Sequence, residues 1–269
     1  MSYKEWGQPN NPNVLVCVHG VTRVGDDFDL LARDLARTYR VVCPDVVGRG
    51  RSDWLPTAAG YQLPQYVSDM VTLLARLDAE TVDWLGTSMG GLIGLGLASL
   101  KANPVRKLIL NDIGPTLNPT ALQRIGEYIG EAVSFEDFDE AVAYIRSISA
   151  TFGAHTEEEW KKLADDVLRQ GPDGRWIRHY DLKLAAPFKE ATPEGTRVAE
   201  ALLWQAYDTV SCPTLLIRGE YSDLLSNDTA QSMSARGPQA QLVVVPGVGH
   251  APTLMHADQI EIVKKFLIG

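Results

Sequence analysis

The chain has 269 residues, of which 45% are hydrophobic and 22% are charged. These values are close to those of average globular proteins, so they exclude a disordered, collagen-like or coiled-coil protein. Acidic residues outnumber basic ones by 34 to 25, which gives a net charge of −9. Because the chain is acidic and has no block of Lys and Arg, we expect no nucleic-acid partner.

The sequence contains no recognisable targeting or membrane-spanning segment. Met1 to Gly7 lack the apolar run of a secretory signal, and no stretch approaches the roughly 18 to 20 apolar residues of a membrane span. The 3 cysteines, Cys17, Cys43 and Cys212, are odd in number and widely spaced, unlike a disulfide framework or a zinc site. We therefore expect a cytoplasmic protein without a metal or an organic cofactor, and we make no prediction of its oligomeric state.

Short apolar runs, rich in β-branched residues and bounded by Gly, Pro, Asn or Asp, recur along the chain. They cover residues 14–18, 41–43, 82–85, 107–110, 214–217 and 242–245. Such runs are typical of strands that are buried on both faces of a parallel sheet. Helical patterns with a period near 3.6 follow them, at residues 28–35, 67–77, from 88 onward and at 258–267. This alternation predicts an α/β fold with a doubly wound, mostly parallel sheet.

The alternation stops between Thr116 and Asp208. This segment shows helical patterns and one turn, Gly171-Pro172-Asp173-Gly174, but no convincing strand. We therefore predict an α/β core formed by residues 1–115 and 209–269, and an inserted all-helical lid formed by residues 116–208. Open α/β sheets bind ligands at the carboxyl ends of their strands, so we expect the lid to cover that edge.

The segment Gly86-Thr87-Ser88-Met89-Gly90 fits the pattern G-x-S-x-G. It follows one predicted strand and precedes one predicted helix, which is the setting that a nucleophilic serine on a sharp turn requires. Glycines on both sides leave room for that turn, and the helix that follows favours negative charge at its first residues. Ser88 is therefore the candidate nucleophile.

A nucleophilic serine needs a base, and the base needs a carboxylate that fixes its tautomer. His250 lies on the loop after the last predicted strand, from which its ring can reach Ser88, so we predict it as the general base. Asp223 follows the preceding strand and is our candidate for the carboxylate. Asp112, after the strand at 107–110, remains its rival, and Glu220 is a weaker third candidate.

Two backbone N–H groups complete the predicted site. His19 and Gly20 follow the first apolar run, and we expect the loop after them to present the N–H of Val21. The N–H of Met89, directly after the nucleophile, is the second expected donor. Together they form an oxyanion hole for a tetrahedral intermediate, while His19 itself is expected to be structural.

Taken together, these motifs resemble the α/β-hydrolase superfamily. The chain is similar to its lid-bearing small bacterial serine hydrolases, the esterases and carbon–carbon hydrolases, over nearly its whole length. The resemblance depends on His19-Gly20, the segment 45–53, the Ser88 motif, the Asp223 loop and Gly249-His250. It implies the order Ser, Asp, His for the catalytic residues and a structural role for the segment 45–53.

The nucleophile limits the reactions that this resemblance allows. Family members that cleave carbon–halogen bonds or epoxides have Asp where this chain has Ser88. Serine attacks carbonyl carbon instead, so we expect cleavage of a small carboxylic ester through an acyl-enzyme. A carbon–carbon hydrolase of a diketone or meta-cleavage product, or a lactonase, is the alternative. A cofactor-free haloperoxidase or a non-hydrolytic ligand receptor is a more distant one.

The sequence specifies the reaction more closely than it specifies the substrate. We expect a small acyl compound that contacts the lid, and Trp204 is one candidate contact. Arg23 lies two residues beyond Val21, where its guanidinium could bind a carboxylate through two hydrogen bonds. If Arg23 binds substrate, the substrate carries an acid group.

Overall fold

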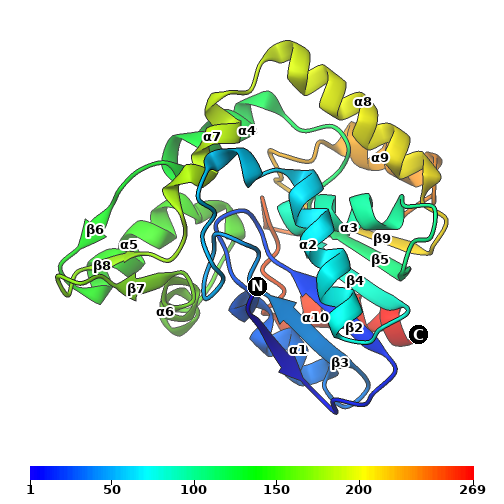
Figure 1. Cartoon of the computed structure of the whole chain (residues 1–269), viewed down its shortest axis with the longest axis horizontal. Coiled ribbons are helices and arrows are strands. Elements are labelled where there is room, and N and C mark those ends of the chain that lie inside the picture. The colour runs from blue at the N-terminus through cyan, green and yellow to red at the C-terminus, as the bar shows by residue number, and fades with distance from the viewer.

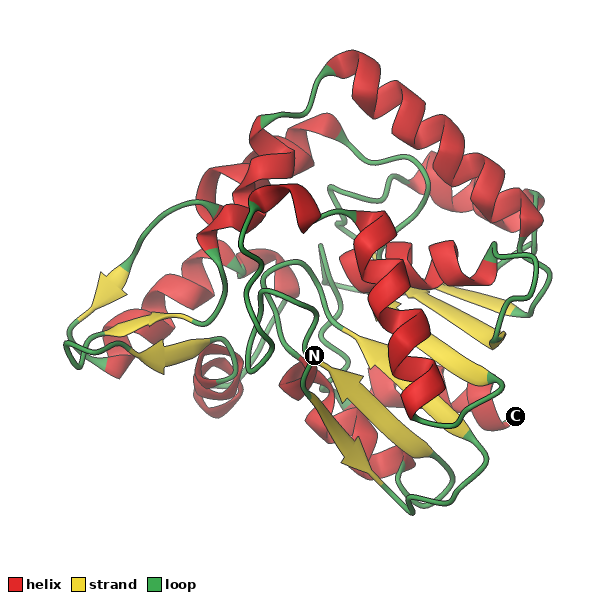
Figure 2. Cartoon of the chain, viewed as in Figure 1, coloured by secondary structure: helices red, strands yellow, loops and turns green.

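The computed structural model describes all 269 residues, which form a seven-stranded sheet with helices on both faces and a separate group of elements at one edge (Figures 1 and 2). The strand order is β1-β3-β2-β4-β5-β9-β10, and only β1 is antiparallel to its neighbour. The strands are β1 (Tyr3–Trp6), β2 (Val14–Val18), β3 (Arg40–Pro44), β4 (Val82–Thr87), β5 (Val105–Asn111), β9 (Thr214–Gly219) and β10 (Gln241–Val245). The predicted fold class and all the predicted strands are confirmed. The short edge strand β1 escaped prediction because its residues are exposed or half-buried rather than apolar throughout.

Alternate residues of each strand contribute to different hydrophobic clusters. In β2, Val16 joins a cluster with α2 and α3, whereas Leu15 joins one with α1 and α10 on the opposite face. Every β2 residue is therefore buried, as its apolar run indicated. The helices of the core are α1 (Asp29–Leu35), α2 (Leu63–Arg76), α3 (Met89–Ala98), α9 (Asn227–Ala235) and α10 (Ala257–Ile268). No helix combines the length and the apolar character that are needed to cross a membrane.

The segment 116–208, which we propose as the lid, runs between β5 and β9. Its elements are α4 (Pro119–Ile129), β6 (Ser134–Phe135), α5 (Phe138–Ile148), α6 (Glu157–Asp165), β7 (Leu168–Gln170), β8 (Trp176–Arg178), α7 (Ala186–Lys189) and α8 (Pro193–Thr209). Figure 1 shows β6, β7 and β8 with α5 and α6 as an arm beside the core, while α8 lies across the top. The prediction that this segment is all-helical is wrong, because β6, β8 and β7 form a small antiparallel sheet. Strands of two or three residues are too short to show an alternating pattern, and only the turn between β7 and β8 was visible in the sequence.

Backbone contacts at two glycines fix the junction between β4 and α3. A Cβ on Gly86 would lie 2.2 Å from the carbonyl carbon of Gly90, and a Cβ on Gly90 would lie 2.0 Å from the carbonyl oxygen of Val18. Backbone atoms in a packed sheet cannot move aside as a flexible side chain does. Only glycine at both positions lets α3 begin directly against the ends of β2 and β4.

We therefore predict that Gly90→Ala lowers the free energy of unfolding by about 3 kcal/mol or more, or prevents folding, because overpacking against backbone is costly. Urea unfolding monitored by circular dichroism measures this change. Gly195→Ala, on α8, is the matched control, since its Cβ would meet one side-chain atom of Thr192 at 3.2 Å. Equal stability of the two variants would contradict this account of the junction.

Candidate active site

Ser88 occupies the turn between β4 and α3, at the carboxyl end of a central strand. Its backbone has φ 52° and ψ −116°, a left-handed region that side-chain-bearing residues rarely adopt. The Ser88 N–H donates to the carbonyl oxygen of Asn111 at 3.0 Å, which ties the turn to the end of β5. The strand, turn and helix that the sequence pattern required are therefore present, with Ser88 at the turn.

His250 lies between Ser88 and a buried carboxylate. Its Nε2 is 3.0 Å from Ser88 Oγ, and its Nδ1 is 2.8 Å from Asp112 Oδ2. Loops after β4, β5 and β10 supply these three side chains, whose contacts span 162 and 138 positions of sequence. The imidazole can therefore hydrogen-bond a hydroxyl and a carboxylate at the same time.

Asp112 is fully buried, and both its carboxylate oxygens have partners. Oδ1 accepts from the Gly219 N–H at 2.8 Å, and Oδ2 accepts from Ser222 Oγ at 2.6 Å as well as facing His250. A fixed acceptor of this kind favours the tautomer of His250 with its proton on Nδ1. The lone pair of Nε2 is then directed at the Ser88 hydroxyl, which is the arrangement that general-base activation requires.

The prediction that Asp223 orients His250 is corrected by this geometry, because Asp112 occupies that position. The Asp223 carboxylate instead accepts two hydrogen bonds from Arg124 of α4, at 3.0 and 3.1 Å, and its side chain is 40% exposed. Both candidates follow neighbouring strands, so spacing alone could not separate them. Asp112 directly follows β5, whereas Asp223 lies four residues beyond the end of β9, where the loop has turned outward.

The loop after β2 is anchored by His19, which is fully buried. Its Nε2 accepts from the Val46 N–H at 3.0 Å, and its Nδ1 donates to the Gly20 carbonyl at 2.7 Å. Burial lowers the pKa of His19 to about 4, so the ring is neutral and serves as a link between two loops. Val21 lies two residues after His19. Val21, Met89 and Ser88 all line one groove, which supports our proposal that the N–H groups of Val21 and Met89 form the oxyanion hole.

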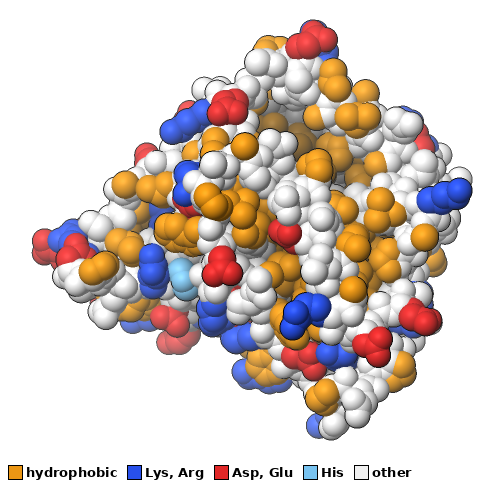
Figure 3. Space-filling view, in the orientation of Figure 1, with side chains coloured by type: hydrophobic (Ala, Val, Ile, Leu, Met, Phe, Trp, Pro, Cys, Tyr) orange, Lys and Arg blue, Asp and Glu red, His pale blue; other side chains and the backbone are white.

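Two cavities meet at Ser88. One is a small cavity of about 70 Å³ beneath α4 and α5, with Ser88, His250 and Val21 in its wall. The other is a groove of about 1630 Å³ between α2, α4, α8 and the sheet edge, also touching Ser88 and Val21. Figure 3 shows apolar side chains gathered around the hollow beneath α8. No group of three or more His, Cys, Asp or Glu side chains is arranged to hold a metal ion.

Arg23 lines the small cavity, but two of its three guanidinium nitrogens already donate hydrogen bonds to Asp27. Nε and Nη2 of Arg23 donate to the Asp27 carboxylate at 2.9 and 2.6 Å. The remaining amino group, Nη1, makes no hydrogen bond within the protein. A contact between Arg23 and substrate therefore stays a prediction that depends on this single nitrogen.

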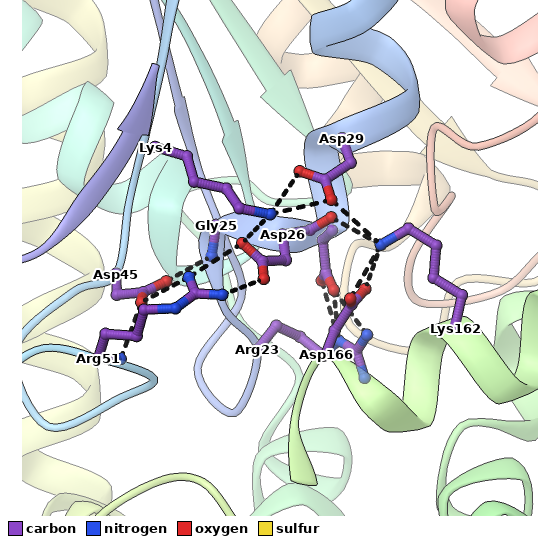
Figure 4. Close-up of polar contacts among 10 residues, drawn as sticks. Lys4, Arg23, Gly25, Asp26, Asp29, Asp45, Arg51, Lys162 and Asp166 are labelled. Carbon is purple, nitrogen blue, oxygen red and sulfur yellow. Dashed lines mark hydrogen bonds and ion pairs between the residues drawn. The ribbon is translucent and has the colours of Figure 1, made fainter. Parts of the chain in front are cut away.

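A network of charges around Arg23 holds its loop against the core and the lid (Figure 4). Asp45 accepts from the N–H groups of Gly25 and Arg51, at 2.8 and 2.9 Å. From α6, Lys162 donates to the carbonyl oxygen of Asp26 at 3.1 Å. Burial and the negative charge of Asp27 raise the pKa of Asp166, at the end of α6, to about 6.

Trp204 lies on α8 but lines neither cavity. Its indole N–H donates to Thr116 Oγ1 at 2.9 Å, and its ring packs edge-on against Tyr207. The guanidinium of Arg236 lies 4.5 Å from the centre of the same ring. The structure therefore gives Trp204 packing contacts and does not bring it to the site.

Comparison with known proteins identifies the family. Residues 13–257 match the family model described as the alpha/beta hydrolase fold. The chain belongs to this family. A 3-hydroxybutyrate-oligomer hydrolase from Cupriavidus necator is 56% identical over 272 residues, covering 100% of this chain and 93% of its own length.

More distant relatives agree with the family assignment. A pimeloyl-[acyl-carrier protein] methyl ester esterase from Stenotrophomonas maltophilia is 28% identical, with 91% of this chain and 89% of that protein covered. The crystal structure of an alpha/beta hydrolase from Novosphingobium aromaticivorans superposes with a TM-score of 0.87 and is 35% identical. The superposition covers 98% of this chain and 92% of the Novosphingobium protein. The chain is thus a hydrolase.

Sequence reasoning missed several polar side chains of the site. Ser222, which donates to Asp112, directly precedes Asp223 in the sequence. Arg124 and Arg178 line the small cavity from α4 and β8, together with Tyr128 and Tyr180. No local motif marks these residues, because they converge only when the segment 116–208 is folded against the core.

We predict that Asp112→Asn lowers kcat/KM for an ester by about 10⁴-fold, because an amide at this position leaves His250 with the wrong tautomer. Asp223→Asn is the matched control and should cost less than about tenfold, because Asp223 is partly exposed and contacts Arg124 instead. Steady-state hydrolysis of p-nitrophenyl butyrate gives both values. A larger loss of kcat/KM in Asp223→Asn than in Asp112→Asn would show that Asp223, and not Asp112, orients His250.

Proposed function

We propose that the protein is a serine hydrolase that cleaves the ester bonds of short hydroxyacid oligomers through an acyl-enzyme on Ser88. The observation that carries this proposal is the continuous hydrogen-bonded line from Ser88 Oγ through His250 to Asp112. A buried carboxylate, an imidazole and a hydroxyl in this order form the constellation that activates serine on several unrelated folds.

In the first half of the reaction, Ser88 Oγ attacks the ester carbonyl while its proton passes to His250 Nε2. The N–H groups of Val21 and Met89 stabilise the oxyanion of the tetrahedral intermediate. The carbon–oxygen ester bond then breaks, and the alcohol leaves with the proton from His250. In the second half, water attacks the acyl carbon while one of its protons passes to His250. The bond between that carbon and Ser88 Oγ then breaks, His250 returns the proton to Oγ, and the acid leaves. Asp112 holds the imidazole and stabilises its charged form in both halves.

The substrate class is supported by two features. The relative with 56% identity over the whole chain is named for cleaving 3-hydroxybutyrate oligomers, which are esters of a short hydroxyacid. The groove of about 1630 Å³ exceeds the roughly 300 to 1,000 Å³ of ordinary small-ligand pockets. Apolar side chains of the groove suit the methyl groups of such an oligomer, and its volume suits more than one unit.

The proposal predicts that Ser88→Ala lowers kcat for the 3-hydroxybutyrate trimer by on the order of 10⁶-fold, because no acyl-enzyme can form. Chromatographic separation of the monomer, dimer and trimer follows the reaction. Ser68→Ala, on the exposed side of α2, should retain full activity.

A wild-type protein that cleaves p-nitrophenyl butyrate but leaves the trimer intact would contradict the substrate class. Trimer cleavage that continues in Ser88→Ala would contradict the mechanism. Trapping of an acyl group on Ser88, detected by mass spectrometry after rapid acid quenching, would support both.

A further inference from the structure

The two cavities lie on chemically different sides of Ser88. His250 lines the small cavity, and it is absent from the lining of the groove. In ester cleavage the histidine gives its proton to the leaving alcohol, so the alcohol portion must lie on the His250 side. For the proposed ester cleavage, this places the leaving alcohol on the side of the small cavity and the acyl chain on the side of the groove.

Three arginines line the small cavity, and two of them are neutralised by carboxylates. Arg23 is paired with Asp27 through two of its nitrogens, and Arg124 is paired with Asp223 in the same way. Both pairs keep their charges balanced within the protein. Neither therefore creates a need for an additional anion.

Arg178, on β8, has no carboxylate within hydrogen-bond distance, unlike Arg23 and Arg124. It is 5% exposed, and all its hydrogen-bond partners are neutral oxygens: Nη1 donates to the Tyr128 carbonyl and the Tyr180 hydroxyl, and Nη2 donates to the Glu131 carbonyl at 3.1 Å and the Tyr144 hydroxyl at 2.8 Å. Its one ion pair is long, at 3.6 Å to the Glu131 carboxylate, and the Glu131 side chain is 54% exposed. Nε of Arg178 is buried and has no hydrogen-bond partner at all. A buried cation with an unpartnered donor is costly unless an anion completes its surroundings.

Arg178 lies in the wall of the small cavity together with Tyr128. Burial raises the pKa of Tyr128, while the positive charges of Arg124, Arg178 and Arg23 oppose that rise. Tyr128 lines the same cavity and its hydroxyl can donate to an anion, whereas the Tyr180 hydroxyl already donates to the Ile129 carbonyl at 3.1 Å and accepts from Arg178. The positive charge is thus placed at the wall of the leaving-alcohol pocket.

We propose that the small cavity binds the free carboxylate of the terminal hydroxyacid unit, with Arg178 as the residue that selects for it. This inference rests on the proposed function and specifies which end of the oligomer is cut. A cavity of about 70 Å³ holds roughly five to seven water-sized groups, which matches a single short hydroxyacid with its carboxylate. The protein therefore removes one unit at a time from the carboxyl end, while the rest of the chain lies in the groove.

The first experiment compares the 3-hydroxybutyrate dimer as a free acid with its methyl ester, which lacks the terminal charge. In the wild type we expect kcat/KM to be at least tenfold higher for the free acid. Arg178→Gln should reduce this ratio by about ten- to a hundredfold, toward one. Arg178→Lys should restore part of it, because the charge remains but the planar fork is lost.

Arg175→Gln is the matched control, because Arg175 lies in the preceding turn and its side chain contacts Ser134 and Glu136 on the surface. It should leave the ratio unchanged. A merely structural role for Arg178 would lower the activity on both substrates and leave the ratio as it was. An unchanged ratio in Arg178→Gln, or a wild type that prefers the methyl ester, would overturn the inference.

The second experiment blocks one end of the trimer at a time and identifies the first product. The trimer with an acetylated hydroxyl end should still release free monomer, whereas the trimer with a methylated carboxyl end should react at least tenfold more slowly. The opposite pattern would overturn the inference and leave the proposed function intact. Failure to cleave any oligomer, with p-nitrophenyl butyrate still hydrolysed, would instead contradict the proposed substrate class.

Discussion

The hydrogen bond between His250 and Asp112 is the contact on which the rest of the site depends. It joins the loops after β5 and β10, and Asp112 also accepts hydrogen bonds from Gly219 and Ser222 after β9. Ser88, after β4, completes the set through His250 Nε2. The ends of neighbouring parallel strands thus meet around one imidazole. Parallel strands make this arrangement available, because their carboxyl ends all lie at one edge of the sheet.

The segment 116–208, our proposed lid, contributes to the same arrangement as well as to the two cavities. Thr151 donates to the carbonyl oxygen of His250 at 2.6 Å, and the N–H of Gly249 donates to the carbonyl of Thr151 at 2.7 Å. Thr151 also lines the small cavity. Folding of the segment 116–208 therefore positions the loop of His250 and closes the small cavity beside it. In our account, positioning of the base and selection of the leaving group depend on one folded segment.

The sequence predicted those features that depend on local pattern. Apolar runs between turn residues located the buried strands, and the Ser88 motif in its strand–helix setting located the turn. The choice between Asp112 and Asp223 could not be made in this way, because both follow strands that are neighbours in the sheet. What separates them is how far each loop has turned away, which depends on tertiary packing. The hairpin β7–β8 escaped because its strands are too short to show an alternating pattern, and the buried Arg178 escaped because most of its partners lie 34 to 50 positions away in the sequence.

The account depends most directly on a proton shared between His250 Nδ1 and Asp112. Proton NMR detects such a proton as a resonance far downfield of the other imidazole signals, and His250→Gln identifies it by its disappearance. We predict that the resonance is present in the wild type and in Asp223→Asn, and that it is lost in Asp112→Asn. A resonance that survives in Asp112→Asn and disappears in Asp223→Asn would contradict the account.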